Sequence, residues 1–209
     1  MENNVSIKKG VYGMIEKAHQ MFRVSFDGFM KNDLDILTNV IKEEQNLTEI
    51  FNALTRSIVE SSKKEISKIE KTVVLGLVDI ISDIERIGDC CVSLVERMEY
   101  KIREELFFSD IAVEEYRELC TKVEPFLSKT AEVIITAENQ DLTKRLIADE
   151  VSINQLVEKY RLAHIHRLAE GICDSRASTM YLDMLDFTRE IVHHCASIAK
   201  QILSFHNKK

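Results

Sequence analysis

Proline, glycine and long apolar runs are scarce in this chain of 209 residues. It contains one proline and six glycines, while charged residues make up 30% of it. This composition is typical of long helices and argues against β-sandwiches and barrels, which need many turn residues. No stretch approaches the roughly 18 consecutive apolar residues of a membrane-spanning helix. The first twenty residues also lack the unbroken apolar segment of a signal peptide.

A basic surface pattern and a disulfide framework are also missing. The net charge is −7, and no stripe of lysines and arginines with interleaved aromatic residues is found, so a nucleic-acid partner is not expected. The five cysteines are odd in number and form no CxxC pair, which predicts reduced, partly buried thiols in a cytosolic protein. The sequence has no glycine-rich phosphate loop, nucleophile elbow or HExxH motif, so we expect neither an enzyme nor an organic cofactor.

The longest periodic segment runs from Val73 to Met98. Apolar residues recur there at alternating spacings of three and four, which is typical of the seam of a long helix packed along other helices. The seam residues are Val73, Leu77, Ile80, Ile84, Ile87, Cys91, Leu94 and Met98. Similar stripes before and after this segment predict five further helices, with short connections that make sequential helices antiparallel neighbours. The predicted fold is all-α, with six long antiparallel helices.

Breaks in the periodicity predict the helix boundaries. A loose end is expected before residue 7, and turns are expected at 31–33, 106–110, 139–141 and 171–178. Asn32 or Asp33 is a candidate cap of the second helix, and Ser109 is a candidate cap of the fourth. Pro125 lies inside the fourth helix and is expected to kink or fray it.

The two halves of the sequence repeat. The segment VIKEEQNLTEI at residues 40–50 aligns with LIADEVSINQL at 146–156, and the third helix aligns with the sixth at an offset of about 104 residues. We therefore predict a tandem pair of three-helix bundles, at residues 1–105 and 106–209, packed as one compact unit. Glu44 and Glu150 occupy matching seam positions, where an ionised carboxylate is costly unless it is paired. Either a structural polar contact or a ligand role explains them.

Carboxylates gather off the seam of the third helix. Glu85 and Asp89 are one turn apart on one face, and Asp79 and Asp83 form a second such pair. Carboxylates at this spacing can share a hard cation or a transition metal. The alternative is a solvated face that Arg86 partly neutralises.

The sixth helix offers a second acidic face, with Asp186, Glu190 and His193 at positions i, i+4 and i+7. Glu190-x-x-His193 is the ligand spacing of di-iron bundles, but such bundles point these groups inward. Here the seam is offset from them, which favours a surface metal site. The full set of candidate metal-contacting residues is Glu85, Asp89, Asp79, Asp83, Asp186, Glu190 and His193.

Two further features bear on the site. Gly88 lies in mid-helix beside the acidic residues, at a cost of about 1 kcal/mol relative to alanine, so another group is expected to approach closely there. His164, His166, His194 and His206 form no recognisable ligand set, and exposed or capping positions are expected for them.

The segment DIERIGD at residues 83–89, with its small and apolar continuation, resembles the signature of PhoU proteins. The segments at 40–50 and 146–156 are similar to the preceding helix of that family, and the tandem three-helix layout is also that of the family. The second signature is degenerate, because Arg189 and His193 stand where the family has acids; a shifted Asp186-x-x-x-Glu190 is a substitute. Residues 108–112 resemble the FSEEA run of the PhoU-like tails of sodium/phosphate cotransporters.

The resemblance implies a cytoplasmic, non-enzymatic regulator of phosphate transport that acts by contact with a phosphate transporter, its sensor kinase or both. Such a protein is peripheral to the membrane through the transporter, and a homodimer is compatible with it. Glu85 and Asp89 are the best candidates for contact with iron, zinc or another divalent or trivalent metal cluster. Two alternatives stay open: the cytoplasmic regulatory domain of a sodium/phosphate cotransporter, and a carboxylate-rich helical metalloprotein with a storage or redox role.

Overall fold

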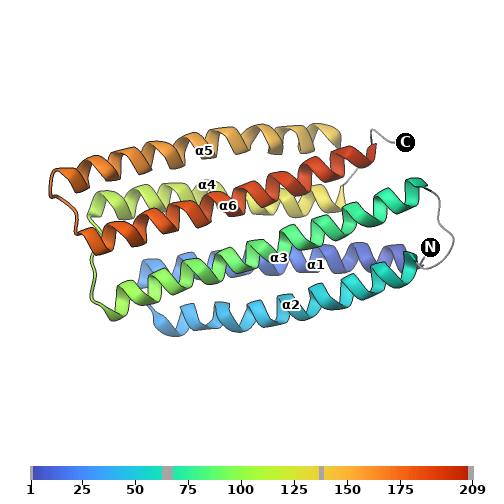
Figure 1. Cartoon of the computed structure of the whole chain (residues 1–209), viewed down its shortest axis with the longest axis horizontal. Helices are drawn as coiled ribbons and strands as arrows, with labels where there is room; N and C mark the ends of the chain where they lie inside the picture. The colour runs from blue at the N-terminus through green and yellow to red at the C-terminus, as the bar shows by residue number, and fades with distance from the viewer. Residues whose placement is uncertain (1, 63–67, 137–138, 207–209) are drawn as a thin grey trace.

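Six α-helices account for nearly all of the structure, a computed structural model that describes residues 2–62, 68–136 and 139–206. The helices are α1 (Glu2–Lys31), α2 (Leu34–Ser62), α3 (Lys68–Arg103), α4 (Asp110–Ile135), α5 (Gln140–Ala169) and α6 (Ser175–His206). Sequential helices run antiparallel (Figure 1), which confirms the predicted all-α architecture. Among the described residues, none of the helices combines the length and the apolar content that crossing a bilayer takes.

Polar side chains begin three of the helices at the predicted turns. Asp33 accepts hydrogen bonds from the backbone N–H groups two and three residues later, at 2.9 and 3.1 Å. Ser109 and Asn139 each accept one from the residue three positions on, at 3.3 and 3.1 Å. These bonds satisfy N–H groups that the first helical turn leaves without a partner. The caps predicted at Asp33 and Ser109 are confirmed.

Two helix boundaries differ from the prediction. The helix α1 already begins at Glu2, so the loose end expected for residues 1–6 is wrong from residue 2 onward. The helix α6 begins at Ser175 rather than near 178, because Asp174 accepts bonds from the backbone N–H groups of the two residues after Ser175. The helix α4 continues through Pro125, so the helix does not fray there, and the kink expected at this position stays a prediction.

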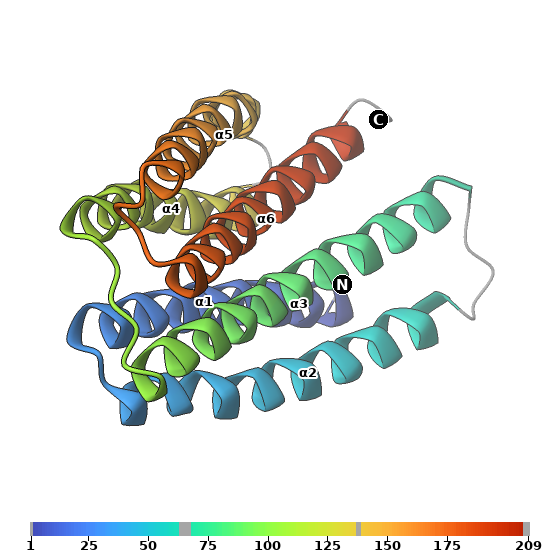
Figure 2. The ribbon, with the colours of Figure 1, turned by 60° about the vertical axis from the view of Figure 1, so that its left-hand side comes forward.

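Two sets of three helices pack together. α1, α2 and α3 contact one another, and so do α4, α5 and α6. The sets meet where α3 lies along α6 and α1 lies along α4 (Figure 2). The contact of α3 with α6 is as extensive as any contact within a set, and the division at residues 105 and 106 stays a prediction from the repeat.

The core explains why α3 is so apolar. The predicted seam is buried from Ile80 to Met98, whereas Val73 is 37% exposed at the start of the helix. Ile81 and Val95, which lie off the predicted seam, are fully buried as well. Because α3 packs against α2 and α6 together, it needs apolar side chains on more than one face.

Gly88 allows α2 to approach α3. A Cβ atom at this position would lie 2.4 Å from Cδ2 of Leu47, far inside van der Waals contact. The close approach expected at Gly88 is therefore that of a fully buried leucine of the neighbouring helix.

Candidate functional site

Three carboxylates from two helices gather on one side of α3. Glu85 and Asp89 belong to α3, and Glu44 belongs to α2; we call these three residues the carboxylate cluster. Partial burial raises the pKa of Glu85, and the charges of Asp89 and Glu44 raise it further against the opposing charge of Arg86. Partial burial and then the Glu44 charge also raise the pKa of Asp89. The misplaced seam glutamate of α2 thus faces the acidic pair of α3.

In the part of the chain that the structure describes, no cation forms an ion pair with the cluster, although the charge of Arg86 acts on Glu85 and Asp89. Glu44 accepts a hydrogen bond from the Thr48 hydroxyl at 2.7 Å. None of the ion pairs between described residues includes Glu44, Glu85 or Asp89. Like charges held together in this way repel one another and favour a bound cation or a cationic partner.

The donor set fits a hard or borderline metal, since carboxylate oxygens are the ligands that such ions prefer. In the described parts of the chain, no three His, Cys, Asp or Glu side chains already stand in an arrangement that holds a metal ion. The chemistry of the cluster therefore matches a metal, while its side-chain positions are not those of a closed coordination sphere.

The second predicted pair on α3 is engaged by α6. Asp83 accepts from Nδ1 of His194 at 2.8 Å, and both side chains are largely buried. Asp79 accepts from the amide nitrogen of Gln201, also at 2.8 Å. These two carboxylates join the halves of the molecule instead of facing the carboxylate cluster.

The predicted site residues of α6 are also partnered. Asp186 pairs with Arg161 of α5 and, at 2.9 Å, with Arg189. His193 is exposed, and its Nδ1 lies 3.4 Å from an oxygen of Glu150. Glu190 is half-buried near Cys90, and its charge contributes, after burial, to raising the pKa of that thiol to about 12.

The two seam glutamates have opposite surroundings. Glu150 is 9% exposed and is neutralised by the ammonium of Lys200 at 2.9 Å, with His193 beside it. The repeat places Arg189 and His193 where the first half has Glu85 and Asp89. The structural polar contact therefore accounts for Glu150, whereas Glu44 has only the Thr48 hydroxyl as a hydrogen-bond partner among the described residues and lies beside two further carboxylates.

Sequence reasoning missed several partners. His164 and His194, expected at exposed or capping positions, are 2% and 9% exposed. His194 is held by Asp83, and His164 lies against the Tyr181 ring at a centroid distance of 4.4 Å. His166 is exposed as expected, and the side chain of His206 lies outside the described residues. No local pattern marks these pairs, because they depend on how distant helices align.

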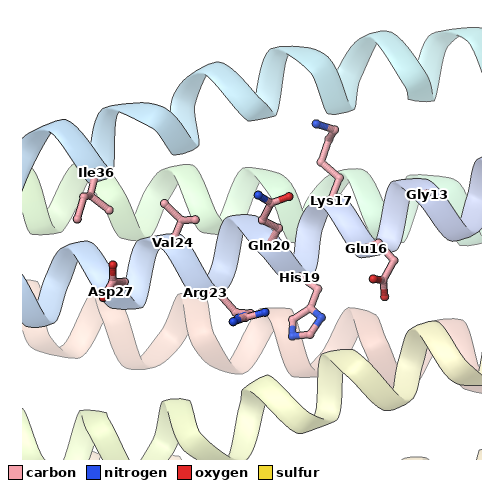
Figure 3. Close-up of a pocket in the computed structure, with 9 residues that line it drawn as sticks. All are labelled: Gly13, Glu16, Lys17, His19, Gln20, Arg23, Val24, Asp27 and Ile36. Atoms are coloured by element: carbon pink, nitrogen blue, oxygen red, sulfur yellow. The ribbon is translucent and has the colours of Figure 1, made fainter.

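A separate groove of about 730 Å³ follows the outer face of α1 (Figure 3). Lys17, which lines the groove, points toward α2 and pairs there with Glu43. His19 points toward α4, where its Nε2 lies 3.0 Å from a carboxylate oxygen of Glu124. The nearby Arg23 lies 3.9 Å from the same glutamate. The cations of this groove are thus already balanced by neighbouring carboxylates.

The raised pKa values of the cluster predict a gain in stability for the variant Glu85→Gln/Asp89→Asn. Between the ordinary carboxyl pKa and the raised one, the folded state binds more protons than the unfolded state, so the stability of the wild type falls as pH rises through this window. We expect the variant to be more stable than wild type at pH 7, by less than about 1 kcal/mol, because both groups keep much of their contact with water. Denaturation at pH 7 and near pH 3 measures the difference; a gain that persists unchanged at the lower pH contradicts the electrostatic origin.

Comparisons with known proteins agree with this description. Residues 11–98 match the PhoU domain family. No curated protein matches the chain in sequence. The crystal structure of PhoU from Pseudomonas aeruginosa is similar with a TM-score of 0.90 and 12% identity, over 100% of this chain and 99% of the other. The crystal structure of the phosphate transport system regulatory protein PhoU from Streptococcus pneumoniae is similar with a TM-score of 0.86 and 11% identity, over 98% of this chain and 95% of the other. The structure of a PhoU-like protein from Shewanella oneidensis MR-1 is similar with a TM-score of 0.71 and 9% identity, over 97% of this chain and 100% of the other.

Proposed function

We propose that this protein regulates phosphate transport, because residues 11–98 match the PhoU domain family and the whole chain has the fold of PhoU structures. The domain match includes α3 through Met98 and therefore the whole carboxylate cluster. One of the similar structures is described as the regulatory protein of a phosphate transport system, and that role is what we propose for this chain.

The regulation acts through protein contact rather than catalysis. The partner is a phosphate transporter, its sensor kinase or both, and the protein meets the membrane from the cytoplasm through that transporter; a homodimer is compatible with this arrangement. The observation that carries the proposal is the carboxylate cluster, whose three members form no ion pair with any described residue although the charge of Arg86 acts on two of them. An acidic, half-buried patch suits either a cationic partner surface or a metal ion between protein and partner.

For metal binding we propose Glu85 and Asp89 as the primary contacts, with Glu44 as a third oxygen donor. Iron, zinc or another multivalent ion would supply positive charge that neutralises the cluster and presents a Lewis-acidic surface. The remaining candidates are tied to other groups or stand apart from the cluster, so they contribute only if they move. These candidates are Asp79, Asp83, Asp186, Glu190 and His193.

The variant Glu85→Gln/Asp89→Asn tests the function in cells. With its chromosomal copy replaced by this variant, the source organism is expected to take up phosphate in phosphate-rich medium at the rate seen under phosphate starvation. The physical reason is that the variant keeps the fold but loses the charges that the partner or metal needs. Radiolabelled phosphate uptake measures the effect.

A matched control is Glu49→Gln/Glu132→Gln, which removes two charges from exposed positions on α2 and α4, outside the cluster. Uptake in this control is expected to remain repressed by phosphate. Normal repression in the cluster variant, with the variant protein present at wild-type levels, would refute the assignment of the site.

A further inference from the structure

The helices α3 and α6 form one of the two contacts between the halves of the molecule (Figure 2). A polar groove of about 460 Å³ is lined by side chains of these two helices. Seven polar side chains line it, four from α3 and three from α6. None of them belongs to the carboxylate cluster. A ligand in this groove would touch both halves at once.

The acceptors that line the groove are already used. Asp83 accepts a hydrogen bond from His194, and Asp79 accepts one from Gln201, both at 2.8 Å. Both bonds cross from α6 to α3. The two carboxylates are therefore turned to the helix interface and partly balanced by donors from the other half.

Several donors in the groove are unused by contrast. The guanidinium of Arg86 takes part in no hydrogen bond or ion pair with any other described residue, although its charge acts on Glu85 and Asp89. The hydroxyls of Ser82 and Ser197 also have no hydrogen-bond partner among the described residues. At the rim, Lys200 gives one hydrogen bond to Glu150, and an ammonium has three donors. The groove thus offers unused donors from α3 and α6, with a guanidinium among them.

We propose that this groove binds a phosphate group, either as inorganic phosphate or as a phosphate monoester. A guanidinium matches two oxygens of a tetrahedral anion with parallel hydrogen bonds, and hydroxyl and ammonium groups add donors around it. The volume accommodates a phosphate with several waters or with an ester substituent. The preference for an oxyanion rests on the free donors; the choice of phosphate among oxyanions rests on the proposed function.

Binding in this groove would link anion concentration to the packing of the two halves. A ligand held by Arg86 from α3 and by Ser197 from α6 stabilises the arrangement in which these helices lie together. The carboxylates of Asp79 and Asp83 beside it limit the affinity, so the complex is weak and reversible. A weak site responds to changes of an abundant anion, which is what a regulator of phosphate transport needs.

Titration of the full chain, labelled with ¹⁵N, tests the proposal by amide chemical shifts. The probes are inorganic phosphate, glycerol 3-phosphate and sodium chloride at equal ionic strength. We expect saturable shifts in α3 and α6 with one or both phosphate compounds and none with chloride. Arg86→Gln is expected to raise the Kd by about tenfold or more, the effect of losing a charge-assisted pair of hydrogen bonds.

The matched control is Arg23→Gln, which removes the same charge from an exposed position in the groove along α1. It is expected to leave the Kd within about twofold of wild type, since that charge is screened at this distance. Saturation with phosphate alone identifies free phosphate as the ligand, and tighter binding of the monoester identifies a phosphorylated molecule. Equal shifts with chloride, no saturation with either phosphate compound, or equal weakening by both variants would overturn the proposal. Because the titration uses purified protein, its failure leaves the uptake experiment on the carboxylate cluster unaffected.

Discussion

Glu115→Ala is expected to lower the free energy of unfolding by about 3–5 kcal/mol, the cost of breaking a buried ion pair. Glu115 on α4 binds both terminal nitrogens of Arg167 on α5, at 3.0 and 2.6 Å, and the two side chains are 14% and 11% exposed. The Tyr181 hydroxyl of α6 donates to the same carboxylate at 3.0 Å. This one group therefore joins all three helices of the second half, and its loss leaves a guanidinium buried without a counter-charge.

Urea denaturation measures the effect, and two further variants separate its causes. Lys31→Ala removes a partner from the exposed pair of Lys31 with Asp27 and is expected to cost less than about 1 kcal/mol. The double variant Glu115→Ala/Arg167→Met is expected to recover part of the loss, because no buried charge remains unpaired. A cost for Glu115→Ala no larger than that for Lys31→Ala would contradict the buried-network description.

Leu94→Ala is expected to cost about 2–5 kcal/mol, the range for truncating a fully buried leucine. Leu94 is 0% exposed and lies on the face of α3 that the periodicity marks as the seam. The matched control on the same helix is Leu75→Ala, at a position that is 65% exposed, with an expected change within about 0.5 kcal/mol. Thermal or chemical unfolding of both variants checks the prediction; similar costs would mean that α3 is not buried along its seam.

The helices themselves could be predicted because their determinants are local. The seam of α3 follows from a spacing of three and four, and the caps at Asp33 and Ser109 follow from side chains that bond the next helical turn. Ile81 and Val95 escaped prediction because a single seam describes one packing face. Their burial depends on how α3 packs against helices that are distant in the chain, which no local pattern encodes.

The candidate site was predictable only in part. Glu85 and Asp89 follow from their spacing on one helix, and Glu44 was marked by its polar character at a seam position. The sequence did not show which carboxylates have a hydrogen-bonded partner on another helix and which, like those of the carboxylate cluster, have none among the described residues. His194 reaches Asp83 and Lys200 reaches Glu150 only because of the register in which α6 lies against α3 and α5. That register is set by the packing of whole helices rather than by any short motif.

The most direct test of the account is the rate of phosphate uptake in phosphate-rich medium, compared between wild type and Glu85→Gln/Asp89→Asn. We expect the variant to take up phosphate at the starvation rate while its protein stays folded and at least as stable as wild type at pH 7. Repressed uptake in cells that contain the folded variant would contradict the claim that the carboxylate cluster is the regulatory site.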